Sequence, residues 1–307
     1  MRWKAGTSVI MAATLFIMLL HANLIFAARG GVYGTADGGA GREKSKGGAV
    51  KIIFLHHSTG AAIWSAGVRE WFEAYNQKNG TRYDIVEQAF PKQSPYGWNN
   101  YPYDYWNIWV KHAGDAPYME EPTLEMLTKT YDVIIFKHCF PVSDILEDTG
   151  NPDVVSAQER IENYKLQYEA LKTKLHQFPK TTFIVWTGAA QVDYSTIRNR
   201  IAALIRGHSN VKQRAQRART FFDWVRKDWD EPGDNIYVWD FYELETEGGI
   251  FMKKEYADSP TNSHPNQTFA KTAANLFCRR VVDVIEGNGD RTSITGGETA
   301  PSAAGPR

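Results

Sequence analysis

Short apolar runs alternate along this chain with longer stretches in which apolar residues recur every three or four positions. The runs have the length of β-strands. The first, third and fourth are almost continuous in isoleucine, valine and phenylalanine, as in parallel strands covered on both faces. They predict five strands, at Lys51–His57, Tyr83–Phe90, Tyr131–Cys139, Thr181–Gly188 and Asn235–Tyr242.

The stretches between these runs carry the period of amphipathic helices. Apolar residues fall on one face over residues 64–75, 161–175, 211–225 and 269–284. Strands that alternate with helices predict an α/β domain with an open parallel sheet and helices on both of its faces. In such a sheet the functional site lies beyond the carboxyl ends of the strands.

The two ends of the chain differ from this middle part. Residues 1–28 combine Arg2 and Lys4 with an apolar run and closing small residues. This pattern predicts a cleaved secretory signal peptide and a periplasmic or extracellular protein; an uncleaved membrane anchor is the alternative. Residues 29–49 predict a flexible linker and residues 287–307 a disordered tail, which leaves residues 50–286 for the folded domain.

Charge and cysteine content narrow the range of partners. The 35 basic residues balance 35 acidic ones, so nothing favours a polyanion and we expect no nucleic-acid partner. Cys139 and Cys278 are too few for a disulfide scaffold, and whether they pair stays open. The aromatic-rich connection at residues 91–130 is long enough to be functional; its rings either pack on the domain or stack on a sugar.

The strongest chemical signal is the segment Phe54–Gly60, in which a buried strand ends and a helix begins. Ser58 would lie there at the carboxyl edge of the sheet, where its own N–H and the start of the helix favour a developing negative charge. A serine becomes a nucleophile only when a base takes its proton. Taken alone, a serine in this position is better explained as a helix N-cap.

A second signal lies just before the last predicted helix, in the segment Asp258–Asn266. His264 stands at the junction of loop and helix, and Pro265 suits a first helical turn. If the helix packs back along the sheet, His264 reaches the same edge as Ser58. In isolation, it is better explained as a surface histidine in a capping segment.

Together the two segments resemble the SGNH (GDSL-like) hydrolase superfamily, which places a serine directly after the first strand and a histidine before the last helix, often as His-Pro-Asn. The resemblance covers Lys51 to about Ile285. It implies a flavodoxin-like three-layer α/β/α sandwich with a five-stranded parallel sheet and no cofactor. It also implies cleavage of an acyl ester, often on a carbohydrate or lipid, through an acyl-enzyme at Ser58 with His264 as the base.

The chain departs from that family at the acid. The family's acid lies three residues before the histidine, where this chain has Thr261. Asp258 is the nearest upstream carboxylate and our first candidate, if the loop curls. Asp240, at the end of the last strand, is the second candidate, and a Ser–His dyad oriented by a backbone carbonyl is the third.

The donors that would hold an oxyanion are also irregular, because the family's glycine after the second strand and its asparagine after the third are missing. The candidates that remain beside the Ser58 N–H are Gly97, Asn99, Asn100, His138 and Ser143.

A metal site would be the competing chemistry at these strand ends. His56, His57, His138 and Cys139 are possible ligands, but adjacent side chains on a strand point to opposite faces. We therefore expect no metal site.

The expected partner is a small-molecule or glycan ester, which would be the substrate. Contact with a membrane would come only through an uncleaved N-terminal segment. Two other functions remain as alternatives to the ester hydrolase: an acyltransferase with the same Ser and His, and a non-catalytic carbohydrate-binding protein on the same fold.

Overall fold

A five-stranded parallel sheet forms the centre of the computed structural model, which describes residues 48–194 and 210–298. Its strands are β1 (Val50–His56), β2 (Tyr83–Ala89), β3 (Val133–Phe136), β4 (Thr182–Trp186) and β5 (Ile236–Trp239). They lie in the order β2-β1-β3-β4-β5, and every neighbouring pair is parallel. The predicted α/β class and flavodoxin-like order are confirmed, with strand ends within a few residues of those expected.

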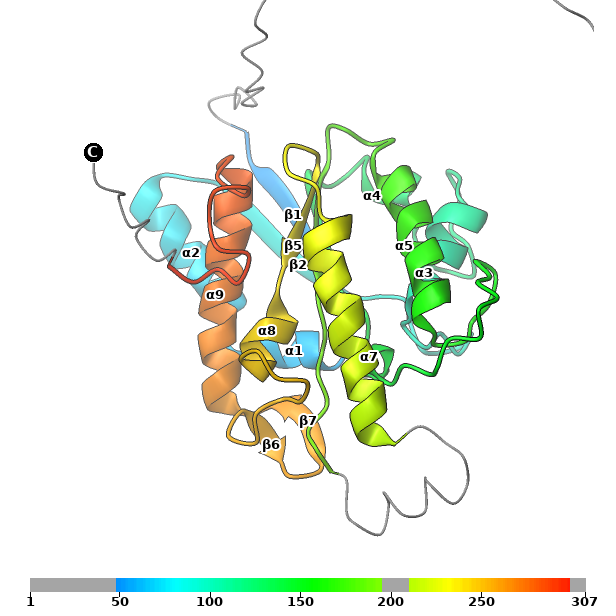
Figure 1. Cartoon of the computed structure of the whole chain (residues 1–307). Coiled ribbons are helices and arrows are strands. Elements are labelled where there is room, and N and C mark those ends of the chain that lie inside the picture. Colours follow the sequence, from blue (N-terminus) through cyan, green and yellow to red (C-terminus); the bar gives the residue numbers. More distant parts are fainter. Residues whose placement is uncertain (1–47, 195–209, 299–307) are drawn as a thin grey trace, which may run out of the picture. The chain divides into compact units, whose positions relative to one another are not determined.

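Helices cover both faces of this sheet (Figure 1). One layer holds α1 (Thr59–Trp64), α2 (Val68–Asn79) and α9 (Gln267–Ile285), and the other holds α3 (Pro102–Trp106), α5 (Ile161–Leu175) and α7 (Val211–Trp224). The helix expected over residues 64–75 is two helices, because Gly67 between them adopts a left-handed conformation with φ 111°. Shorter elements are η1 (Asn107–Lys111), α4 (Leu124–Leu127), η2 (Phe140–Ser143), η3 (Val225–Trp229), α8 (Phe241–Thr246), β6 (Ala257–Ser259) and β7 (Asn262–Pro265).

The aromatic connection between β2 and β3 is mainly part of the core. Tyr105 and Trp109 are fully buried and contact each other edge-on, with ring centroids 5.1 Å apart. Both rings also pack on Phe136 at the end of β3. Tyr96 is the large exposed ring of this connection, at 41%. Most of these residues therefore anchor the connection on the domain.

Residues 287–298 form a clasp over the free edge of the sheet, where a disordered tail was expected. The backbone N–H of Asp240, after β5, donates to the carbonyl of Ile294 (2.9 Å), and Trp239 Nε1 donates to Thr295 (3.0 Å). The buried Arg280 of α9 donates to the carbonyl of Gly289 (2.5 Å). These hydrogen bonds tie residues 287–298 to the end of the edge strand β5 and to α9, and a composition poor in apolar residues does not reveal them.

Other predictions about the ends of the chain lie outside the described residues: the signal peptide, nearly all of the linker, and residues 299–307. Within the part that is described, no helix is long and apolar enough to cross a membrane. Cys139 and Cys278 are both free thiols.

Candidate active site

Ser58 occupies a sharp turn between β1 and α1, which we call the nucleophile turn (residues 56–60). Its backbone has φ 49° and ψ −102°, a conformation that a non-glycine residue rarely adopts. Ser58 is the N-cap residue of α1, but its side chain makes no capping hydrogen bond. Its hydroxyl is thus free for another partner, which argues against capping as its role.

Tight packing holds this turn. A Cβ added to Gly60 would lie 2.5 Å from Cβ of His56, so only glycine fits at this position without a shift of its neighbour. His57 Nε2 donates to the carbonyl of Pro91 (2.5 Å), and the Lys137 ammonium donates to the carbonyl of His57 (3.4 Å). The turn is therefore tied to the segments that follow both neighbouring strands.

The two histidines of the turn are uncharged at neutral pH. Burial, helped by the positive charge of Lys137, lowers the pKa of His56 to about 3. Burial also lowers the pKa of His57. The neutral His56 ring contacts the Glu87 carboxylate (2.8 Å). These rings act as hydrogen-bonding supports of the turn rather than as free bases.

His264 reaches Ser58 from a small hairpin made of β6 and β7, which we call the His264 hairpin (residues 257–265). Its Nε2 and the Ser58 hydroxyl are hydrogen-bonded, although the two residues are 206 positions apart in the chain. The hairpin strands are antiparallel and pair Ala257 with Pro265. A serine hydroxyl in contact with an imidazole nitrogen is the arrangement that general-base activation of a nucleophile requires.

The other ring nitrogen of His264 contacts a residue that we did not predict. Nδ1 lies 2.6 Å from Oδ1 of Asn262, and Nδ2 of Asn262 donates to Asp258 Oδ2 (2.9 Å). Asp258, our first candidate for the acid, thus contacts the amide of Asn262, which lies between this carboxylate and the His264 ring. The backbone carbonyl that we considered for orienting the ring is likewise replaced by the side-chain carbonyl of Asn262. In the sequence, the signal for this role of Asn262 was its position two residues before His264.

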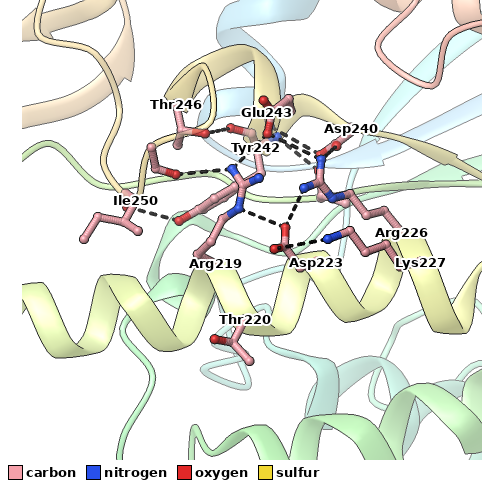
Figure 2. A network of polar contacts seen from close by, with 12 residues as sticks. Arg219, Thr220, Asp223, Arg226, Lys227, Asp240, Tyr242, Glu243, Thr246 and Ile250 are labelled. Atoms are coloured by element: carbon pink, nitrogen blue, oxygen red, sulfur yellow. Dashed lines mark hydrogen bonds and ion pairs between the residues drawn. The ribbon is translucent and has the colours of Figure 1, made fainter.

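Asp240, the second candidate for the acid, belongs to a different network (Figure 2). It accepts hydrogen bonds from the hydroxyl of Thr187 (2.6 Å) and from Arg226 of η3 (3.2 Å), and it caps α8. Burial raises its pKa, and the Thr187 and Arg226 contacts oppose that rise. Figure 2 shows Asp240 among the arginines and acids that join α7 to α8. These partners account for its position without His264.

Asn100 is the predicted oxyanion donor that lies next to the nucleophile turn. Its side-chain amide donates to the carbonyl of Pro91 (3.4 Å), which also accepts from His57, and its Oδ1 has no partner among the described residues. Its backbone carbonyl accepts from the N–H of Cys139 (3.0 Å). Asn100, from the connection between β2 and β3, therefore lies beside the end of β3, where the family resemblance led us to look for an asparagine.

The remaining oxyanion candidates have other surroundings. His138 is fully buried among aromatic rings, 4.6 Å from Tyr105 between centroids, and burial lowers its pKa to about 3. Ser143 donates its hydroxyl to the carbonyl of Ala189. Gly97 and Asn99 are exposed, and their N–H groups donate to Gln93 and Asp104 within their own loop.

Sequence reasoning also missed a buried lysine beside the site. Lys137 is 1% exposed, and burial lowers its pKa to about 8, against the attraction of Cys139 and Glu245. Glu245 is fully buried as well and accepts from the N–H of Ala190 (2.6 Å). In the sequence, the signal for this buried lysine was its position directly after the apolar strand β3.

The histidines considered as metal ligands do not converge. His56 faces Glu87, His57 faces Pro91, and His138 lies in the aromatic core. Within residues 48–194 and 210–298, no three His, Cys, Asp or Glu side chains are grouped as a metal site requires.

Comparisons with known proteins give distant likenesses. No family model and no curated protein matches the chain. Among solved structures, it is similar to an acetyl xylan esterase, at 13% identity and TM-score 0.42, over 73% of this chain and 96% of the other. A gut microbial diltiazem-metabolizing enzyme is similar at 10% identity and TM-score 0.42, over 80% of this chain but only 48% of the other. Likenesses this distant assign no activity to this chain.

Proposed function

We propose that this protein is a serine hydrolase of SGNH type that cleaves carboxylic esters, with Ser58 as nucleophile and His264 as general base. The observation that carries the proposal is the contact between the Ser58 hydroxyl and His264 Nε2 at the carboxyl edge of the sheet. The strained backbone of Ser58 supports it, because strain of this kind is characteristic of serines held at a strand-to-helix turn for attack.

The reaction would proceed in two halves. His264 Nε2 takes the hydroxyl proton of Ser58 while the serine oxygen bonds to the ester carbonyl carbon. The bond to the alcohol oxygen then breaks, and His264 returns the proton to that oxygen. In the second half, water gives a proton to His264 and its oxygen attacks the acyl-enzyme. The carboxylic acid leaves as Ser58 regains its proton.

The negative charge on the carbonyl oxygen needs hydrogen-bond donors. We propose the N–H of Ser58 and the side-chain amide of Asn100, since Asn100 lies beside Pro91 and His57 at the end of β3. One such donor typically lowers the barrier by about 3 kcal/mol. The long contact from Asn100 to Pro91, at 3.4 Å, is one that the amide can exchange for an oxyanion.

The substrate and location are also part of the proposal. An acyl group on a carbohydrate is the substrate class that we favour, because the exposed ring of Tyr96, on the connection after β2, offers a face on which a sugar can stack. The pattern of residues 1–28 supports export to the periplasm or the cell exterior.

The test uses the purified protein with p-nitrophenyl acetate and a fluorophosphonate probe. We expect the wild type to release nitrophenol and to be labelled at Ser58, and Ser58→Ala to lose both with an unchanged melting temperature. Ser65→Ala, an exposed serine at the end of α1, is the matched control and keeps both.

Two outcomes would replace the proposal by another function. An unlabelled wild type indicates a binding protein on this fold. Labelling together with product that depends on an added acceptor alcohol indicates an acyltransferase.

A further inference from the structure

The polar chain behind His264 determines which of its nitrogens carries the proton. Oδ1 of Asn262 faces two groups of His264, Nδ1 of the ring (2.6 Å) and the backbone N–H (3.1 Å). Nδ2 of Asn262 faces a carboxylate oxygen of Asp258 (2.9 Å). A carboxylate only accepts hydrogen bonds and a backbone N–H only donates, so the amide of Asn262 has a single consistent orientation.

This orientation defines the tautomer of His264. Because Oδ1 of Asn262 only accepts, Nδ1 of the neutral ring must carry the hydrogen. Nε2 is then left with its lone pair toward the Ser58 hydroxyl, as a general base needs. In the opposite tautomer, Nδ1 and Oδ1 would meet lone pair to lone pair, and Nε2 would be unable to accept the serine proton.

We propose that Asn262 takes the place of the catalytic carboxylate as the positioning residue of His264, and that Asp258 acts through it by locking the amide. This inference rests on the proposed function for its kinetic consequences. Asp258 is exposed, so its charge is screened by water and its effect is mainly geometric. An uncharged amide behind the ring favours the protonated imidazole less than a carboxylate would.

Exchanging the two residues gives the sharpest experiment. The double variant Asn262→Asp with Asp258→Asn keeps the net charge and the hydrogen bond between positions 258 and 262, with the amide now donating to a carboxylate that touches His264. We expect it to remain active on p-nitrophenyl acetate. The acidic limb of its kcat/KM profile should move about one pH unit upward, because the carboxylate favours the charged imidazole.

Single variants separate positioning from simple support of the hairpin. Asn262→Ala should lower kcat about 100-fold and leave KM within threefold, while Asp258→Ala should lower kcat less than tenfold. Thr261→Ala, at the exposed tip of the hairpin, is the matched control and keeps the wild-type kcat. A kcat of Asn262→Ala within twofold of the wild type, or an unmoved acidic limb in the exchanged variant, overturns the proposal.

A measurement without turnover separates this inference from the proposed function. Long-range 1H–15N spectra of the wild type at neutral pH should show the hydrogen of His264 on Nδ1, and Asn262→Ala should show a mixture of tautomers. A wild-type ring with its hydrogen on Nε2 overturns the inference. The expected tautomer combined with no fluorophosphonate labelling leaves the positioning intact and refutes the hydrolase.

Discussion

The nucleophile turn and the His264 hairpin meet at one hydrogen bond but are held by different forces. The turn follows a strand whose residues Ile52–His56 are all buried, and Gly60 lies directly against His56. The hairpin has two short paired strands and is half exposed, and the Asp258–Asn262–His264 chain of hydrogen bonds runs along it. Changes at the tightly packed residues of the turn, His56 and Gly60, should therefore cost stability and activity together, whereas changes in the hairpin should cost activity with the fold retained.

The largest expected effect on stability is at Gly60. Gly60→Ala forces a methyl group to within 2.5 Å of Cβ of His56, an atom that cannot move without the strand. We expect a loss of about 3 kcal/mol in the free energy of unfolding, measured by urea denaturation. Gly297→Ala is the control, since the added Cβ would make ordinary contact at 3.4 Å. A loss below about 1 kcal/mol would show that the turn is more loosely packed than we argue.

The next largest effect is on kcat, at Asn100 beside the nucleophile turn, where hydrogen bonding can be separated from packing. Asn100 has φ 66°, so Asn100→Gly removes the amide and keeps a backbone that glycine tolerates. We expect kcat to fall about 100-fold, from the loss of the proposed oxyanion donor, while the free energy of unfolding changes by about 1 kcal/mol or less. Steady-state kinetics and urea denaturation on the same preparation test this. An unchanged kcat would remove Asn100 from the oxyanion hole.

A third effect concerns the buried His138, which lies among aromatic rings just after β3. The pKa of folded His138 is about 3, below the 6.5 of an ordinary histidine. As the pH falls below 6.5, the unfolded chain takes up a proton that the folded chain does not, so stability falls. From this residue alone we expect a loss of about 2 kcal/mol between pH 7 and pH 5.

His138→Phe should remove that part of the acid sensitivity, since phenylalanine suits the aromatic cage and does not titrate. His56 keeps its own share in the variant, because the pKa of its buried ring is also about 3. Denaturation midpoints at the two pH values test the difference. Equal acid losses in variant and wild type would contradict it.

The smallest effect is on the hairpin side, at the start of α9. Asn266 accepts from the N–H of Phe269 (2.9 Å) as the N-cap and donates to the carbonyl of Glu255 (2.7 Å). Asn266→Ala should lower the free energy of unfolding by about 1 kcal/mol and kcat by less than tenfold. Asn275→Ala, exposed within the same helix, should change stability by less than about 0.5 kcal/mol. A collapse of the fold in Asn266→Ala would contradict the proposed contrast.

Helix α9 begins later in the chain than the sequence predicts. Pro265 was expected in the first helical turn, but it ends β7, and the helix begins at Gln267 after its Asn266 cap. The asparagine of the His-Pro-Asn motif thus serves the helix, which in turn holds the end of the hairpin. Local preferences of proline allow both positions, so the sequence alone does not separate them.

Sequence alone determined the sheet, the place of Ser58 after the first strand and the place of His264 shortly before the last helix, because buried parallel strands and amphipathic helices leave a periodic record. The hairpin strand β7 that carries His264 was not predicted. Tertiary structure decided what stands beside them. Asn262 on Nδ1, Asn100 at the end of β3 and the clasp of residues 287–298 all depend on polar contacts between segments or across a turn. Such contacts need one donor and one acceptor at about 3 Å, and no periodic pattern in the chain records that distance.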